Sequence, residues 1–183
     1  MRKITICFMH PEQSFFIETV KTAFPEFFYG TRVLDIGSLD INGNNRQFFD
    51  NCDYTGIDIG AGKNVDVIAR GHQYVADVPF DVVISTECFE HDEFYPQTLQ
   101  AVCNRHLKPG GLLVFTCATT GRPEHGTRRT SPADAPFVGD YYKNLIEADI
   151  RACINVDTIF EKYGFSTRQN PADLYFYGIK RKA

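Results

Sequence analysis

Residues 32–43 read RVLDIGSLDING, a short apolar run that ends at Gly37. A second run, YTGIDI at 54–59, ends in an acidic residue, Asp58. In an open parallel sheet, ligands bind beyond the carboxyl ends of the strands, where a glycine lets them approach the backbone closely. Asp58 follows Gly37 by 21 positions, a spacing typical of a carboxylate that binds the two hydroxyls of a ribose. A plain tight turn would explain Gly37 alone, but the pair predicts a ligand of nucleoside type.

Strand-like and helix-like segments alternate around these two runs. The apolar and β-branched stretches predict strands at 32–37, 54–59, 65–69, 80–86, 112–118, 165–170 and 174–180. Helical spacing predicts helices at 12–28 with a kink or end at Pro25, at 44–51, 96–107, 137–153 (one helix or two) and 155–163, where Gly164 would end the last one.

The strand at 80–86, FDVVIST, is apolar throughout, which is typical of a parallel sheet covered by helices on both faces. The last two strands are separated by a few residues only, so they must form an antiparallel hairpin. We therefore expect an α/β fold, a Rossmann-like three-layer sandwich. Its sheet would be mostly parallel and seven-stranded, with an antiparallel C-terminal hairpin.

The composition favours a single domain over residues 1–183. The chain has 19 Lys and Arg against 23 Asp and Glu, a net charge of −4, whereas general nucleic-acid or anionic-membrane binders normally carry a basic excess. Six cysteines form no CxxC pair, which supports neither a zinc ribbon nor a thioredoxin-type motif. No apolar run is long enough for an export signal or a membrane span. We expect a cytoplasmic protein with reduced, buried thiols.

Four segments resemble the class I S-adenosylmethionine-dependent methyltransferases, in particular the small bacterial methyltransferase-domain type. They are RVLDIGSLDINGNNRQFF at 32–49, YTGIDIGAGKNVDV at 54–67, FDVVISTECFEHD at 80–92 and LKPGGLLVFT at 107–116. They follow one another in the order and spacing of that family. The resemblance implies an enzyme that uses S-adenosylmethionine.

The resemblance also implies roles for particular residues. The turn around the amino-acid part of the cofactor would be formed by Asp35, Gly37, Ser38 and Leu39. Asp58 would be the carboxylate that binds the ribose, and Ile59 would be the apolar neighbour of the adenine. The residues near the methyl group would be Thr86 and Glu87. Two features depart from the family. The glycine loop is not Gly-x-Gly-x-Gly, and the third strand is followed by Arg70-Gly71-His72 where an acidic residue usually reads the adenine. Backbone groups would then read the adenine.

A hydroxyl or protonated amine that accepts a methyl group must lose a proton. The candidates for this step are Glu90 and His91 after the fourth strand and His125 after the fifth, because an unperturbed imidazole titrates near neutral pH. The alternatives are a solvated helix start, with Asp92 as its cap, and an exposed loop histidine. No metal site is expected, since Glu90, His91 and Asp92 are sequence neighbours and such neighbours rarely converge on one ion.

Residues 119–136, TTGRPEHGTRRTSPADAP, form a long connection without periodicity, and such loops are usually functional or disordered. We interpret 119–153 as a loop or lid on the acceptor side, in which Arg122, Arg128 and Arg129 either clamp an anionic group or are solvated. The expected reaction is methyl transfer to oxygen or nitrogen of a small-molecule, glycan or carrier-bound acceptor. A homodimer is possible, and neither nucleic acid nor membrane is expected as a partner.

Two other functions stay open. A catalytically inactive methyltransferase-like binding module would explain the irregular glycine loop. A nicotinamide-dependent oxidoreductase would also use a glycine turn such as Gly37 and a ribose-binding carboxylate such as Asp58. It would normally show GxGxxG at the first turn, however.

Overall fold

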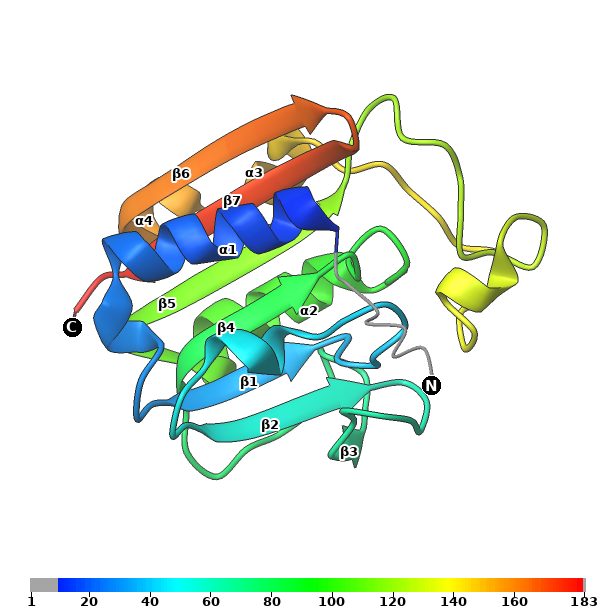
Figure 1. Cartoon of the computed structure of the whole chain (residues 1–183). Coiled ribbons are helices and arrows are strands. Elements are labelled where there is room, and N and C mark those ends of the chain that lie inside the picture. Colours follow the sequence, from blue (N-terminus) through cyan, green and yellow to red (C-terminus); the bar gives the residue numbers. More distant parts are fainter. Residues whose placement is uncertain (1–9, 183) are drawn as a thin grey trace, which may run out of the picture.

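The computed structural model describes residues 10–182, which fold around a seven-stranded sheet (Figure 1). The strands are β1 (Arg32–Ile36), β2 (Asp53–Asp58), β3 (Val67–Ile68), β4 (Phe80–Thr86), β5 (Leu107–Ala118), β6 (Phe160–Gln169) and β7 (Ala172–Lys180). Their order in the sheet is β3-β2-β1-β4-β5-β7-β6. Strands β1 to β5 pair in parallel, and β7 pairs antiparallel with both β5 and β6. The expected seven-stranded sheet with its C-terminal hairpin is confirmed.

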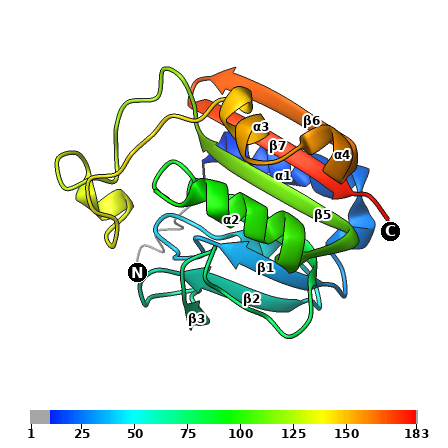
Figure 2. The same cartoon turned by 180° about the vertical axis from the view of Figure 1, so that it is seen from behind.

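Helices cover both faces of the sheet, as unbroken apolar strands require. The helical segments of the described chain are α1 (Pro11–Ala23), η1 (Pro25–Phe27), η2 (Asn45–Phe48), α2 (Tyr95–Ala101), η3 (Val102–His106), η4 (Pro132–Asp134), α3 (Glu147–Cys153) and α4 (Val156–Ile159), of which η4 lies in the loop that projects from the sheet. Helix α1 lies on one face in Figure 1, and Figure 2 shows α2, α3 and α4 on the other. The expected break at Pro25 is confirmed, because proline cannot continue the hydrogen-bond ladder of α1.

Neighbouring residues of each central strand point into different cores. Val82 and Ile84 of β4 pack with Ile17 of α1 in one cluster of buried side chains. Val83, one position away, packs with Leu99 of α2 in the other cluster. This alternation is what a strand buried on both faces produces. The sheet is therefore the middle layer of the three-layer sandwich.

The expected helix over 155–163 is wrong beyond Ile159, because β6 begins at Phe160. The pairing of β6 with β7 shifts between Phe160 and Lys162, so one extra residue enters the strand. Phe160, Tyr163 and Phe165 all contact the ring of Phe176, with centroids 5.4, 6.4 and 4.6 Å away. The bulge thus puts residues three apart on one face, and this spacing imitates a helix in the sequence.

The expected helix or helices over 137–153 are confirmed only for α3, and residues 137–146 form no helix. In this segment the Lys143 amide donates to the Glu90 carbonyl at 2.9 Å, and the Leu145 amide donates to the Ala118 carbonyl at 2.8 Å. The backbone groups that a helix would pair internally instead hold the segment to the ends of β4 and β5. The chain before it, yellow in Figure 1, projects from this end of the sheet.

Two general expectations concern thiols and membranes. Within residues 10–182, all five cysteines are free, namely Cys52, Cys88, Cys103, Cys117 and Cys153. The sixth, Cys7, lies outside the described residues. Among the helices of the described chain, none is both long and apolar enough to cross a bilayer.

Candidate active site

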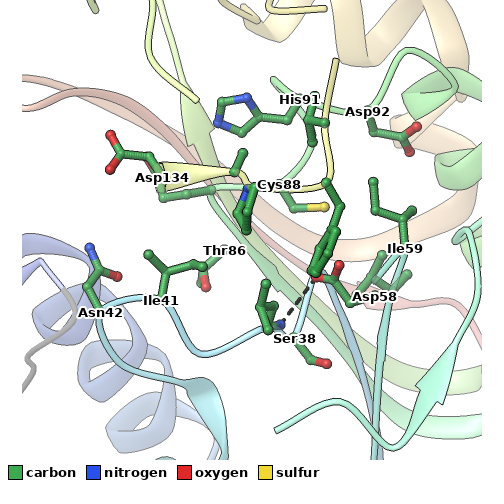
Figure 3. Close-up of a pocket in the computed structure, with 18 of the residues that line it drawn as sticks. Ser38, Ile41, Asn42, Asp58, Ile59, Thr86, Cys88, His91, Asp92 and Asp134 are labelled. Atoms are coloured by element: carbon green, nitrogen blue, oxygen red, sulfur yellow. Dashed lines mark hydrogen bonds between the residues drawn. The ribbon is translucent and has the colours of Figure 1, made fainter. Parts of the chain in front are cut away.

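A cavity of about 720 Å³ opens at the carboxyl ends of β1, β2 and β4. This volume lies in the usual range of small-molecule sites, about 300–1,000 Å³. Its floor includes every residue predicted to bind the cofactor, and segments 122–125 and 130–138 contribute the opposite wall. Figure 3 shows Asp58 and Ile59 on one side of the cavity and His91 on the other. The fold therefore brings the residues predicted to bind the cofactor and the two predicted histidines, His91 and His125, to one cavity. Glu90, the third predicted catalytic residue, is fully buried and does not line it.

The turn after β1 depends on Gly37. Its φ is +79°, and a Cβ built there would lie 2.5 Å from the Cys88 sulfur. The amides of Gly37 and Ser38 both donate to the Ile57 carbonyl, at 2.9 and 3.0 Å. The turn is thus fixed between β2 and the loop after β4. A side chain at this position would meet both a steric and a conformational obstacle.

Asp35 lies under this turn and is fully buried. Its carboxylate accepts hydrogen bonds from the Tyr54 hydroxyl at 2.7 Å and from the side-chain amide of Asn45 at 3.0 Å. Burial raises the pKa of Asp35 to about 6, although both hydrogen bonds oppose the shift. The Asn45 amide also donates to the Thr86 hydroxyl at 3.1 Å, so one amide joins the ends of β1 and β4.

Asp58 stands at the end of β2, at the edge of the cavity. Its carboxylate accepts from the backbone amides of Leu39 and Gly60, both at 3.2 Å. Burial raises its pKa, and the backbone hydrogen bonds oppose that shift. These bonds use one acceptor position on each oxygen and orient the carboxylate, and a carboxylate oxygen has a second lone pair for a ligand hydroxyl.

Exposed apolar side chains line the cavity. Ile41, Ile59 and Phe137 are 38, 36 and 49% exposed. The Phe137 ring comes from the loop and packs on Gly60, where a Cβ would lie 2.0 Å from the ring. A flat aromatic ligand would cover this apolar surface. Together with the glycine turn and the Asp58 carboxylate, it fits the adenosyl group of S-adenosylmethionine.

The end of β3 carries no acidic side chain, as the sequence indicates. Ala69, Arg70 and Gly71 line the cavity here, and Arg70 is 3.9 Å from the Glu93 carboxylate. Asp92 also lines the cavity. Its carboxylate accepts from the Phe94 amide at 2.8 Å and from the Thr98 hydroxyl at 2.6 Å. Asp92 therefore organises the start of α2, which is the alternative role considered for it.

Acidic side chains gather after the end of β4 and at the start of β7, where Glu90 and Asp173 are fully buried and Glu87 is partly buried. Glu87 has a φ of +51°, and its carboxylate accepts from the Thr116 hydroxyl at 2.9 Å. The Glu90 carboxylate accepts from the Ala118 amide at 3.1 Å, and Asp173 is fully buried. Burial raises the pKa of all three carboxyls, that of Glu90 to about 7.

One guanidinium faces this acidic group. Arg122 donates to Asp173 at 2.8 Å and lies 3.9 Å from a Glu87 oxygen, with 14% of its side chain exposed. The alternative of a solvated surface residue is therefore wrong for Arg122. Arg129 is more exposed and pairs with Glu124 at 3.1 Å and Asp140 at 3.5 Å.

Glu90, His91 and His125 form a compact cluster. Their nitrogen and oxygen donor atoms lie within 4.8 Å of one another, although Glu90 and His91 follow β4 and His125 follows β5. Burial lowers the pKa of His91 to about 4, so this imidazole is neutral at pH 7. Asp92 points away from His91 in Figure 3. The cluster thus combines two of the three sequence neighbours with a residue from the long loop.

Sequence reasoning missed several residues of the cavity. Gln13 lines it from α1, is 3% exposed, and has a side-chain nitrogen with no partner among residues 10–182. Gln13 lies four residues before the buried Ile17 and seven before Val20, so a polar residue on an apolar helix stripe was the available signal. Asp173, which pairs with Arg122 and does not line the cavity itself, carried no such signal, because its importance comes from a contact with a distant residue.

Comparisons with known proteins agree with this geometry. The family model of the methyltransferase domain matches residues 8–137. Among solved structures, the N-methyltransferase NodS from Bradyrhizobium japonicum WM9 is similar at a TM-score of 0.59 and 14% identity, over 93% of this chain and 97% of that one. A 1,6-didemethyltoxoflavin-N1-methyltransferase from Burkholderia thailandensis, with bound S-adenosylhomocysteine, is similar at 0.61 and 14%, over 93% and 84%.

A third structure, a complex of DhpI with SAH, has a TM-score of 0.66 at 14% identity and covers 98% of this chain and 89% of that one. No curated protein matches the sequence. At these identities the structural likeness shows the shared fold. The family model, which spans most of the chain, shows the family. The chain belongs to the methyltransferase domain family and is an S-adenosylmethionine-dependent methyltransferase.

Proposed function

We propose that this enzyme methylates an oxygen or nitrogen atom of a small-molecule, glycan or carrier-bound acceptor. The observation that carries the proposal is the position of His91 and His125 on the same cavity as the Gly37 turn and Asp58. S-adenosylmethionine supplies a methyl group on a positively charged sulfur. An accepting hydroxyl or ammonium must lose a proton, and imidazole and carboxylate side chains are suited to that task.

The cofactor would lie along the floor of the cavity. Asp58 would bind the ribose hydroxyls and Ile59 would pack on the adenine, while Asp35, Gly37, Ser38 and Leu39 would surround the amino-acid part. Thr86 and Glu87 at the end of β4 would then be next to the methyl group. The volume, the exposed apolar side chains and the hydrogen-bonded Asp58 carboxylate support this placement.

The acceptor would enter from the side of the loop at 119–153. This segment contributes His125 and the 130–138 wall of the cavity, and Tyr142 packs on both histidine rings at 5.1 and 5.5 Å. Glu90, His91 and His125 would activate the acceptor atom. Between Glu90 and His91, the proton would settle on Glu90, whose pKa of about 7 is the higher. The N-methyltransferases among the similar structures favour nitrogen as one acceptor type.

Calorimetric titration with S-adenosylmethionine, S-adenosylhomocysteine and NADH tests the cofactor site. We expect micromolar binding of the first two and none of NADH. Asp58→Ala should weaken binding by at least about tenfold, the loss expected when a pair of charge-assisted hydrogen bonds disappears. Unchanged affinity in Asp58→Ala would show that the site assignment is wrong.

A radiolabelled methyl-transfer screen over alcohols, amines, glycans and carrier-bound substrates tests the acceptor. Label on an oxygen or nitrogen atom, located by NMR of the product, is the expected result. Methylation of carbon or of a nucleic-acid base would contradict the proposal. Cofactor binding with no turnover on any acceptor would favour the inactive binding module.

A further inference from the structure

Glu90, His91 and His125 bring an oxygen and two nitrogen donors to one point on the acceptor side of the cavity. These atoms lie within 4.8 Å of one another. In a tetrahedral zinc site with bonds of about 2.1 Å, ligand atoms are about 3.4 Å apart. Side-chain rotations that move each donor atom by about one ångström would therefore bring the three residues around one ion.

Two polar atoms of these residues are buried and unsatisfied. Glu90 Oε2 and His91 Nδ1 have no hydrogen-bond partner in the described part of the chain, whereas Glu90 Oε1 accepts from the Ala118 amide. Buried polar atoms in folded proteins nearly always have a partner. Since Glu90 is 0% exposed, its free oxygen is an indication that a ligand belongs there.

His125 is oriented as a metal ligand would be. Its Nδ1 is 3.1 Å from the Pro123 carbonyl, so the tautomer that donates this hydrogen bond leaves Nε2 with a lone pair. Ligating histidines typically donate their second N–H to a carbonyl or carboxylate in this way. The same carbonyl accepts a hydrogen bond from the Tyr142 hydroxyl at 3.2 Å. The side-chain amide of Asn144 donates to the Arg122 carbonyl at 2.9 Å. The loop that carries His125 is therefore anchored.

The local charge also favours a cation. Glu90 and Asp173 are fully buried and Glu87 is partly buried, and Arg122 pairs with Glu87 and Asp173. Buried charges are normally paired or coordinate metals. A bound cation would give the Glu90 carboxylate a partner of opposite charge.

We propose that Glu90, His91 and His125 hold a divalent first-row transition-metal ion of the Zn²⁺ or Mn²⁺ type. A mixed set of imidazole and carboxylate donors suits these ions, whereas Mg²⁺ and Ca²⁺ prefer oxygen donors throughout. Three protein ligands leave a position open for water or substrate, as in catalytic rather than structural sites.

The role of the ion rests on the proposed function, although its binding does not. An acceptor hydroxyl at the open position would lose its proton to water more readily, because a bound dication lowers the pKa of a coordinated oxygen. The acceptor oxygen then forms its bond to the methyl carbon while the carbon–sulfur bond breaks, and the electron pair of that bond stays on sulfur. Atoms and charge balance without any further reactant.

Titration calorimetry of the chelator-treated enzyme with Zn²⁺, Mn²⁺ and Mg²⁺, without cofactor, tests the site. We expect one Zn²⁺ or Mn²⁺ per chain, bound at least tenfold more tightly than Mg²⁺. His125→Ala and the isosteric Glu90→Gln should each weaken that binding by about 10–100-fold. His72→Ala is the matched control, because its ring packs on Phe94 outside the cluster, and it should bind the ion as the wild type does.

Each variant is also titrated with S-adenosylhomocysteine, which reports the fold and the cofactor site independently. Wild-type affinity for this compound in His125→Ala, together with weakened metal binding, supports the proposal. Equal metal binding in wild type and both cluster variants, or no metal binding by the wild type, overturns it. Metal binding without any cofactor binding would instead overturn the proposed function and leave the metal site standing.

Discussion

Gly126 packs against the His91 ring so closely that a Cβ on Gly126 would lie 2.7 Å from His91 Cε1 and 3.2 Å from Nδ1. The φ of Gly126 is +63°, a conformation that residues with a side chain rarely adopt. The loop after β5 can therefore bring His125 to His91 only because the next residue is glycine.

Gly126→Ala should displace this loop from His91. We expect the rate of methyl transfer to fall by about 10–100-fold, because a misplacement of about an ångström costs that much in an oriented reaction. Affinity for S-adenosylhomocysteine should stay within about twofold of the wild type. Gly139→Ala is the control, since a Cβ there meets no atom within 4 Å. An unchanged rate in Gly126→Ala would mean that the two histidines do not act together.

Gly37→Ala separates steric from conformational effects at the cofactor turn. Both Gly37 and Gly30 have positive φ, but a Cβ at Gly30 meets nothing within 4 Å, whereas one at Gly37 would lie 2.5 Å from the Cys88 sulfur. Gly30→Ala should cost only about 1 kcal/mol of unfolding free energy and leave cofactor affinity unchanged. Gly37→Ala should weaken that affinity by more than about tenfold.

The double variant Gly37→Ala/Cys88→Gly tests the cause of this loss. A Cβ at Gly37 would lie 2.5 Å from the Cys88 sulfur and 2.6 Å from its Cβ, and Cys88→Gly removes both atoms. This change should recover part of the cofactor affinity, and the strain from φ should remain. Calorimetry with S-adenosylhomocysteine gives the affinities and urea unfolding gives the stabilities. If Gly37→Ala binds like Gly30→Ala, the turn does not approach the cofactor.

Asp35 predicts a pH dependence of stability. Burial raises its pKa from 3.8 to about 6, so the folded state binds this proton more tightly than the unfolded chain does. The contribution to stability is thus fully present below about pH 4 and is lost as pH rises to about 6. For a buried carboxyl, a shift of this size corresponds to about 3 kcal/mol.

Asp35→Asn should remove that part of the dependence. Urea unfolding of both proteins between pH 4 and 7 should show a difference in free energy that shifts in favour of the variant as pH rises, by about 2–3 kcal/mol in total. The Tyr54 hydroxyl can still donate to the amide oxygen. A difference that does not vary with pH would show that Asp35 titrates normally in the folded protein.

Much of the fold was predictable because the signals are local. The run at 32–37 and the strand at 80–86 have the apolar composition of buried parallel strands, and both appear close to the expected bounds. The helix predicted over 155–163 is wrong beyond Ile159, because a bulge in β6 makes the spacing of Phe160 and Tyr163 look helical. The pairing of β6 with β7 decides between a helix and a bulged strand here, and the sequence of β6 alone does not reveal that pairing.

The candidate site also has a part that the sequence predicts and a part that it does not. Gly37 and Asp58 were predictable, since both stand at strand ends and parallel strands place these ends together. The grouping of Glu90 and His91 with His125 was not predictable, because it depends on the anchored loop between Arg122 and Asn144. The sequence neighbour Asp92 was the natural third member, yet its carboxylate is used at the start of α2.

Arg122 provides the strongest test of the buried acidic group. Arg122→Met removes the partner of Asp173, whose side chain is fully buried, and should lower the unfolding free energy by about 3–5 kcal/mol at pH 7.5. The loss should shrink toward pH 5, because burial already raises the pKa of Asp173 and Glu87 and protonation removes their uncompensated charge. Adding Asp173→Asn should restore at least half of the lost stability.

The exposed residue Arg129 offers the matched comparison for this prediction. It pairs with Glu124 at 3.1 Å with 58% of its side chain exposed, so Arg129→Met should cost at most about 1 kcal/mol. Urea unfolding of all variants at pH 5 and 7.5 gives the comparison. Equal losses for Arg122→Met and Arg129→Met would show that the acidic group is hydrated rather than buried.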